Sequence, residues 1–112
     1  MKTRESDWKV YRKRVPDWRE RYLDRKNQEI VELLTDREGT PTERFWKTLK
    51  KMKEEKHTLV ECFDPHSRSR MLISLFLMHR HGIIDDADLN EFSTELQEWI
   101  RTSISSLDCM PE

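Results

Sequence analysis

The sequence has very few residues that interrupt regular structure. Glycine occurs only twice among 112 residues, at Gly39 and Gly82, and proline four times. So few turn-forming residues, together with abundant Lys, Arg, Glu and Leu, favour helices over many short strands. We therefore predict an all-α protein. The chain also lacks a phosphate-binding glycine loop and a glycine-rich nucleophile turn, so the common sequence signatures of nucleotide-binding proteins and serine hydrolases are missing.

Long hydrophobic runs and cysteine clusters are missing as well. No apolar segment approaches the length of a membrane span, and no hydrophobic signal region opens the chain, so we expect a cytoplasmic protein with no membrane contact. Two cysteines, Cys62 and Cys109, are too few for a disulfide framework or a complete zinc site. The four histidines form no recognised ligand motif. We expect no metal and no cofactor.

Charge is abundant but unevenly distributed. Charged residues make up 38% of the chain and the formal net charge is −1. Residues 1–30 hold ten Lys/Arg against six Asp/Glu, whereas residues 61–112 hold four against ten. A basic N-terminal third and an acidic C-terminal half can attract each other, within one chain or between two copies. Four tryptophans argue for a folded chain, because disordered chains are poor in aromatic residues.

The N-terminal third carries one apolar helical stripe. Its members are spaced three and four residues apart, as on one face of a helix: Trp8, Tyr11, Val15, Trp18 and Tyr22. Pro16 interrupts this segment and either kinks one long helix or starts a second one. Because the stripe continues through Pro16, we expect a short leading helix and a long one, nearly collinear, ending near Asp36.

A clear helix start follows at residues 40–46. Thr40 is a good N-cap, Pro41 suits the first helical position, and Glu43 completes a capping box. We predict that this helix buries Phe45, Trp46, Leu49 and Met52. Whether residues 57–64 continue the helix or form a linker stays open, although Pro65 must end it.

The third predicted helix spans residues 67–81, with Ser67 as its cap and Gly82 as a left-handed stop. Its middle is apolar on almost every side, which is typical of a core helix. A last helix, capped by Asp85, then presents Leu89, Phe92, Leu96 and Trp99. We therefore predict one domain, residues 1–112, in which four to five helices pack around residues 67–81. Residues 1–6 and 106–112 are expected to be loose, and a homodimer or a partner protein is expected to cover part of the apolar surface.

Two arginines stand at the start of the third helix, in the stretch "HSRSR". Ser67, Arg68 and Arg70 could hold a phosphate or a carboxylate there, since a helix N-terminus attracts anions. The alternative is that Ser67 only caps the helix. Arg68 and Arg70 would then pair with carboxylates of the same chain, such as Asp64 or those of the acidic C-terminal helix. We favour this second interpretation.

Three segments together resemble small uncharacterised bacterial helical proteins. They are R-V-x-x-W at Arg14, Val15 and Trp18, S-R-S-x-M at residues 67–71, and G-I-I-x-x-x-D-L-x-x-F-S at residues 82–93. The resemblance implies an all-helical fold and no particular activity.

These patterns predict a non-enzymatic protein that acts by protein–protein contact, as a regulator, adaptor or inhibitor, of phage or plasmid type. Aromatic and arginine side chains are frequent interface anchors. The candidate contact or anion-binding residues are Trp8, Tyr11, Arg14, Trp18, Ser67, Arg68 and Arg70. The competing hypothesis is nucleic-acid binding through the basic N-terminal helix together with Arg68 and Arg70.

Overall fold

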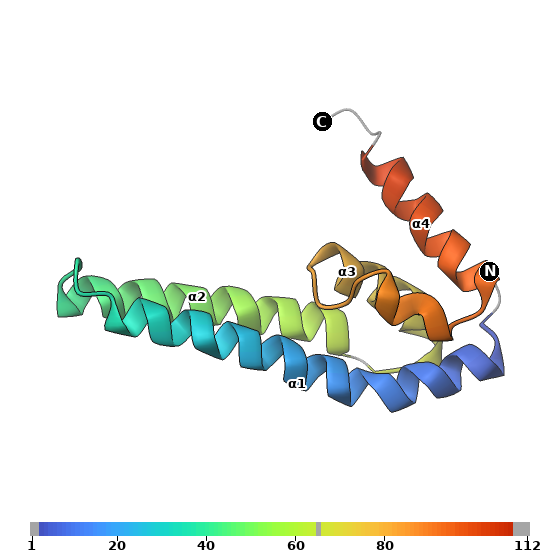
Figure 1. Ribbon diagram of the computed structural model, residues 1–112, viewed down its shortest axis with the longest axis horizontal. Coiled ribbons are helices and arrows are strands. Elements are labelled where there is room, and N and C mark those ends of the chain that lie inside the picture. The colour runs from blue at the N-terminus through green and yellow to red at the C-terminus, as the bar shows by residue number, and fades with distance from the viewer. Residues whose placement is uncertain (1–2, 65, 109–112) are drawn as a thin grey trace.

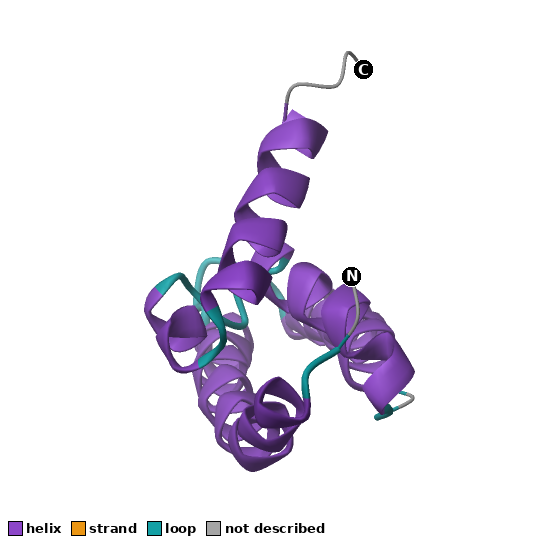
Figure 2. Cartoon of the chain, turned by 90° about the vertical axis from the view of Figure 1, so that its right-hand side faces the viewer, coloured by secondary structure: helices purple, strands orange, loops and turns teal. Residues whose placement is uncertain are grey.

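The computed structural model describes the backbone of residues 3–64 and 66–108 and the side chains of these residues as far as Ile104. The described part is all-helical and contains no strand (Figure 2). In chain order the elements are α1 (Glu5–Thr35), α2 (Pro41–Phe63), the 3-10 turn η1 (Arg68–Arg70), α3 (Met71–Arg80), the 3-10 turn η2 (Ala87–Glu91) and α4 (Thr94–Asp108). Within these residues no helix combines the length and the apolar character that a membrane span needs.

The two longest helices form an antiparallel hairpin that determines the shape of the molecule. α1 and α2 lie side by side, and the loop between them is at one extremity (Figure 1). α3, η2 and α4 all lie toward the opposite end, and α4 leads away from the hairpin. The molecule is correspondingly elongated, with extents of 52 × 36 × 23 Å. Far from the core, therefore, the hairpin consists of only two helices.

Pro16 does not divide the first helix. α1 is one continuous helix with Pro16 inside it, so the expected division into a short and a long helix is wrong. Pro16 cannot donate a hydrogen bond to Arg12, but its ring is exposed to solvent. Its neighbours Val15 and Trp18 are 1% and 3% exposed. Burial of this stripe on both sides of the proline holds the helix together.

α2 starts where its sequence pattern predicts, but most of the side chains that the pattern predicts to be buried are exposed. The Thr40 hydroxyl accepts a hydrogen bond from the Glu43 N–H at 3.1 Å, and the helix continues to Phe63, so residues 57–63 are not a linker. Phe45, Trp46 and Met52, however, are 57%, 59% and 52% exposed. They lie on the part of the hairpin that no third helix covers. The prediction that they are buried is therefore wrong for the single chain.

The start of the third helix also differs from its prediction. α3 begins at Met71 after the turn η1, and the Ser67 side chain makes no capping hydrogen bond. Gly82 does end the helix in the left-handed conformation, with φ +74°. Met71, Leu75 and Met78 are fully buried, so α3 contributes to the core. Ile73 is 50% exposed, so the helix is not enclosed on all sides.

The predicted last helix is divided into two elements. η2 ends at Glu91, the backbone of Phe92 after it is extended, and α4 begins at Thr94. The Ser93 hydroxyl accepts a hydrogen bond from the Leu96 N–H at 3.3 Å and so caps α4. The prediction that Leu89 to Trp99 lie on one helix is therefore wrong, although Leu89, Phe92 and Leu96 are all buried.

A single core joins α1, the end of α2 and the C-terminal elements. Its buried apolar members are Tyr11, Val15, Trp18, Tyr22, Cys62, Phe63, Met71, Leu75, Met78, Ile83, Ile84, Leu89, Phe92, Leu96 and Ile100. Of the segments expected to be loose, residues 5–6 and 106–108 are helical. Residues 1–2 and 109–112 lie outside the described residues.

Candidate functional site

Arginines of α1, together with Arg4 just before it, contact the acidic segment 82–95. Arg14 forms a bidentate pair with Glu91, with nitrogen–oxygen distances of 2.6 and 2.5 Å. Nearer the N-terminus, Arg4 contacts Glu95 at 2.9 Å. The hydrogen-bonded pairing keeps the pKa of Glu91 below its usual value. The attraction expected from the uneven charge distribution is therefore present within one chain.

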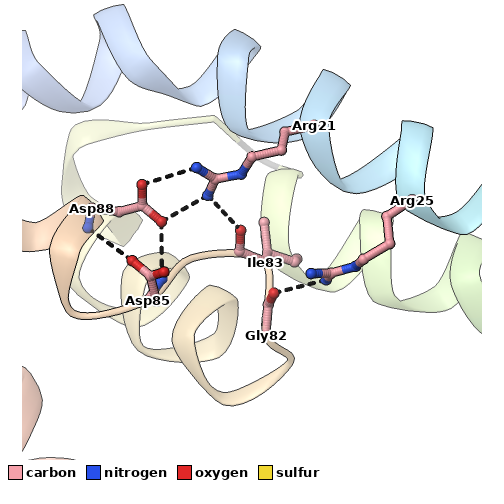
Figure 3. A network of polar contacts seen from close by, with 6 residues as sticks. All are labelled: Arg21, Arg25, Gly82, Ile83, Asp85 and Asp88. Atoms are coloured by element: carbon pink, nitrogen blue, oxygen red, sulfur yellow. Dashed lines mark hydrogen bonds and ion pairs between the residues drawn. The ribbon is translucent and has the colours of Figure 1, made fainter.

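Arg21 makes the most extensive set of contacts in this region (Figure 3). Its guanidinium donates to both carboxylate oxygens of Asp88, at 3.0 and 2.7 Å, and to the carbonyl oxygen of Ile83 at 3.0 Å. One turn later, Arg25 donates to the carbonyl oxygen of Gly82 at 2.9 Å. The left-handed conformation of Gly82 turns the chain at this point, and Arg21 and Arg25 then fix the turn against α1.

Asp88 and Asp85 cap each other. The Asp88 N–H donates to the Asp85 carboxylate at 3.1 Å, and the Asp85 N–H donates to the Asp88 carboxylate at 2.9 Å. Asp85 thus accepts a hydrogen bond at the start of η2, but Asp86 directly precedes that turn, and the prediction that Asp85 caps a helix is wrong. Burial by itself would raise the pKa of Asp88, but hydrogen bonds from Arg21 and Asp85 outweigh burial and lower it.

A groove of about 360 Å³ runs between α1 and η2. It is lined by Arg14, Asp17, Trp18, Arg21, Ala87, Asp88 and Glu91. Its two arginines are already bonded to its carboxylates. A ligand would have to break these pairs before it could use either charge. The groove is therefore better explained as part of the contact that holds the C-terminal segment to α1.

Arg68 is paired, but not with the carboxylates that were expected. Its guanidinium contacts Glu5 at 2.5 Å, so its partner is at the N-terminus and not in the C-terminal helix. Arg70 has no ion pair among the described residues, and its Nε is buried without a hydrogen-bond partner there. Ser67 lies beside Ser69, with their hydroxyl oxygens 3.3 Å apart. No side-chain hydrogen bond among the described residues joins Ser67, Arg68 and Arg70 to one another.

The aromatic candidates of α1 belong to the core. Tyr11 and Trp18 are 1% and 3% exposed, so they are not accessible to a partner in this structure. Trp8 is half-buried and lies against Tyr11 and His66, with ring centroids 5.7 and 5.6 Å away. Burial raises the pKa of Tyr11. Of the aromatic candidates, only Trp8 has access to solvent.

In the part of the chain that the structure describes, the histidines and Cys62 form no metal-binding cluster. His79 lies 2.9 Å from Asp86, and His81 lies 3.6 Å from Glu61. Among the described residues, no group of three or more metal-ligating side chains comes together. Burial raises the pKa of the Cys62 thiol to about 12, so this cysteine is protonated near neutral pH and is a poor nucleophile.

The most exposed apolar residues lie on the hairpin, where the sequence did not place a site. The contact between α1 and α2 is largely polar in this region: Tyr22 donates to Glu55, and Lys51 lies 3.6 Å from Glu29. The apolar side chains of this region follow the residues of the α1–α2 contact by one position along each helix. We call this surface the hairpin face; it consists of Leu23, Ile30 and Leu34 of α1 with Phe45, Leu49 and Met52 of α2.

Both apolar stripes lie on the same side of the hairpin. Leu23 and Ile30 each follow a contact residue of α1 by one position, and Met52 follows the contact residue Lys51 of α2. A step of one residue turns a helix surface by about 100°. In an antiparallel pair, this step carries both stripes to the same side. The hairpin face is therefore one continuous surface, and its 3–4 spacing is a signal that the sequence contained.

Comparison with protein-family models, with curated proteins and with solved structures finds no match for this chain. Its function must therefore be argued from the surfaces and contacts described above.

Proposed function

We propose that this protein is non-enzymatic and acts by protein–protein contact, with the hairpin face as the contact surface. The observation that carries the proposal is the exposure of Phe45 and Met52, at 57% and 52%, on a stripe with regular helix-packing spacing. Aromatic residues and methionine are enriched at protein interfaces. Fully burying one exposed side chain of this size contributes about 1.5–3 kcal/mol, and because Phe45 and Met52 are only a little over half exposed, covering each contributes roughly half of that.

Neighbouring side chains extend the same surface. Leu34 is 49% exposed at the end of α1, and Trp46, at 59%, borders the face on α2. By contrast, the charged residues between α1 and η2 already satisfy one another, so they offer a ligand little free charge. A regulator, adaptor or inhibitor that binds through its hairpin is the function that these features favour.

The proposal is tested with the full chain as bait in quantitative co-purification from cells. Met52→Glu places a charge on the hairpin face, and Ile73→Glu is the matched control because Ile73 is equally exposed, at 50%, but lies on α3. We expect wild type and Ile73→Glu to retain the same protein, whether another protein or an untagged copy of the chain, and Met52→Glu to lose it. Circular dichroism verifies that both variants are folded.

Equal retention by all three baits would contradict the proposal, because the contact would then not involve the hairpin face. Retention of nothing by the wild-type bait, including an untagged copy, would also contradict it.

A further inference from the structure

We infer that the hairpin face is covered by a second copy of this chain. Two α1–α2 hairpins would pack face to face into a four-helix bundle, with both 36–40 loops at the same end. The inference rests on the proposed function, since it names the partner of the same surface. Two observations support it: the charges that border the hairpin face, and the packing of the C-terminal elements on the other side of the hairpin.

The two edges of the hairpin face carry opposite charges. Lys53 and Lys56 border it on α2, and both are exposed. Neither of these lysines forms an ion pair within the residues that the structure describes. Glu20 and Asp24 border it on α1 and are also exposed. A face with one basic and one acidic edge can complement itself.

A two-fold axis along the hairpin makes these edges meet. Such an axis places α2 of each copy over α1 of the other, so that the lysine edge faces the acidic edge at both borders. Tyr22 contacts Glu55 and Glu29 contacts Lys51, so Asp24 lies level with residues 53–55 of α2. Asp24 of one copy would then face Lys53 and Lys56 of the other.

The other two-fold arrangement is disfavoured by the same charges. With the two loops at opposite ends, α2 would lie over α2 and the two lysine edges would face each other. Like charges that face each other destabilise a contact and select against that arrangement. The charge pattern therefore selects both the partner and its orientation.

The C-terminal elements leave the hairpin face accessible. They are attached through Arg21 and Arg25 of α1 and through Glu61 of α2, which contacts His81. At 100° per residue, these positions lie on the side of each helix roughly opposite Leu23 and Met52. A second copy can thus approach without displacing α3 or α4.

The inference is tested by sedimentation velocity and light scattering of the full chain from micromolar to submillimolar concentration. We expect a species of twice the 13.7 kDa chain mass that dissociates on dilution. Met52→Glu should weaken association by about tenfold or more, which corresponds to about 1.4 kcal/mol. Ile73→Glu should associate like the wild type. A wild-type chain that keeps the single-chain mass at every concentration would overturn the inference.

The orientation is tested by charge exchange. Lys53→Glu with Lys56→Glu should weaken the dimer, and adding Asp24→Lys to this pair should restore much of the lost affinity. A triple variant that associates no better than the double variant would overturn the proposed orientation. If the chain is monomeric but the bait still retains another protein through Met52, this inference falls and the proposed function stands.

Discussion

At the scale of single residues, a buried carboxylate connects the first turn of α1 to the start of α4. Asp7 is 2% exposed and accepts hydrogen bonds from the N–H and the hydroxyl of Ser93, both at 2.7 Å. Ser93 also caps α4. The sequence contains a signal for this contact, because Asp7 lies four residues before Tyr11 on the apolar side of α1. The spacing does not identify Ser93 as the partner.

Replacing Asp7 tests this contact. Asp7→Ala leaves two Ser93 donors without an acceptor in a buried position, which should lower the free energy of unfolding by about 1–3 kcal/mol. Urea denaturation followed by tryptophan fluorescence measures the change. Asp17→Ala is the matched control, because Asp17 is exposed and its one ion pair, with Arg14, is long at 3.7 Å. Equal losses in the two variants would contradict a specific role for Asp7.

Asp88 should contribute to the loss of stability in acid. Its pKa is lowered in the folded protein, so the unfolded chain takes up the proton first as pH falls. The stability that Asp88 contributes is present above the ordinary aspartate pKa of about 3.9. It is lost as pH falls through the lower pKa that Asp88 has in the folded protein.

The pH dependence can be measured by comparing wild type with Asp88→Asn. The variant should be less stable at neutral pH and should lose less stability between neutral pH and pH about 3, because position 88 no longer titrates. Urea denaturation at several pH values gives both curves. Parallel curves would show that Asp88 does not contribute to the acid sensitivity.

At the scale of elements, side-chain burial decides where helices continue and where they end. α1 continues through Pro16 because residues on both sides of the proline are buried on one stripe. The stripe from Leu89 to Leu96 is equally regular, yet the chain is extended at Phe92 and a new helix starts after Ser93. The bonds from Ser93 to Asp7 provide an alternative to helical hydrogen bonding at that position.

Pro16→Ala should stabilise α1. Alanine restores a donor for the Arg12 carbonyl, and the proline ring is exposed, so no packing is lost. The gain is reduced by the greater freedom of the unfolded chain, which leaves an increase of about 1–2 kcal/mol. Thermal and urea unfolding measure it. Pro41→Ala serves as the control, because proline suits the first position of α2, and this variant should show no gain.

At the scale of the whole molecule, the uneven charge acts mainly within the chain. Arg14 and Arg21 of the basic α1 pair with Glu91 and Asp88 of the acidic C-terminal segment. Two of the charges that the nucleic-acid hypothesis needs, those of Arg14 and Arg68, are thus engaged with carboxylates. Each exposed pair contributes little energy, but together they hold the C-terminal elements at one end of the hairpin.

The nucleic-acid hypothesis has a direct test in a salt titration. We expect no binding of a short DNA or RNA fragment at low salt, measured by fluorescence anisotropy, because binding would compete with these internal pairs. Glu91→Gln, which releases Arg14, is a useful comparison. Affinity for the wild type that falls steeply between low and physiological salt would support nucleic-acid binding instead.

The helical class, the start of α2 at Thr40, the left-handed stop at Gly82 and the attraction between the basic and acidic parts of the chain could all be predicted from the sequence. These features depend on local backbone chemistry or on total charge, both of which can be read without knowing which helices meet. Helical spacing likewise identified Tyr11, Val15, Trp18 and Tyr22 as one stripe, and they are buried.

Which apolar stripes are covered could not be predicted, because it depends on how the helices are arranged in space. Phe45, Leu49 and Met52 have the same spacing as core residues, but α3 and α4 lie toward the far end of the hairpin and do not reach them. Likewise, Arg68 pairs with Glu5 and Ser93 bonds to Asp7 because residues far apart in the sequence are close in space. The spacing of apolar residues in the sequence predicts which side of a helix is apolar. Whether that side is buried depends on where the other helices lie.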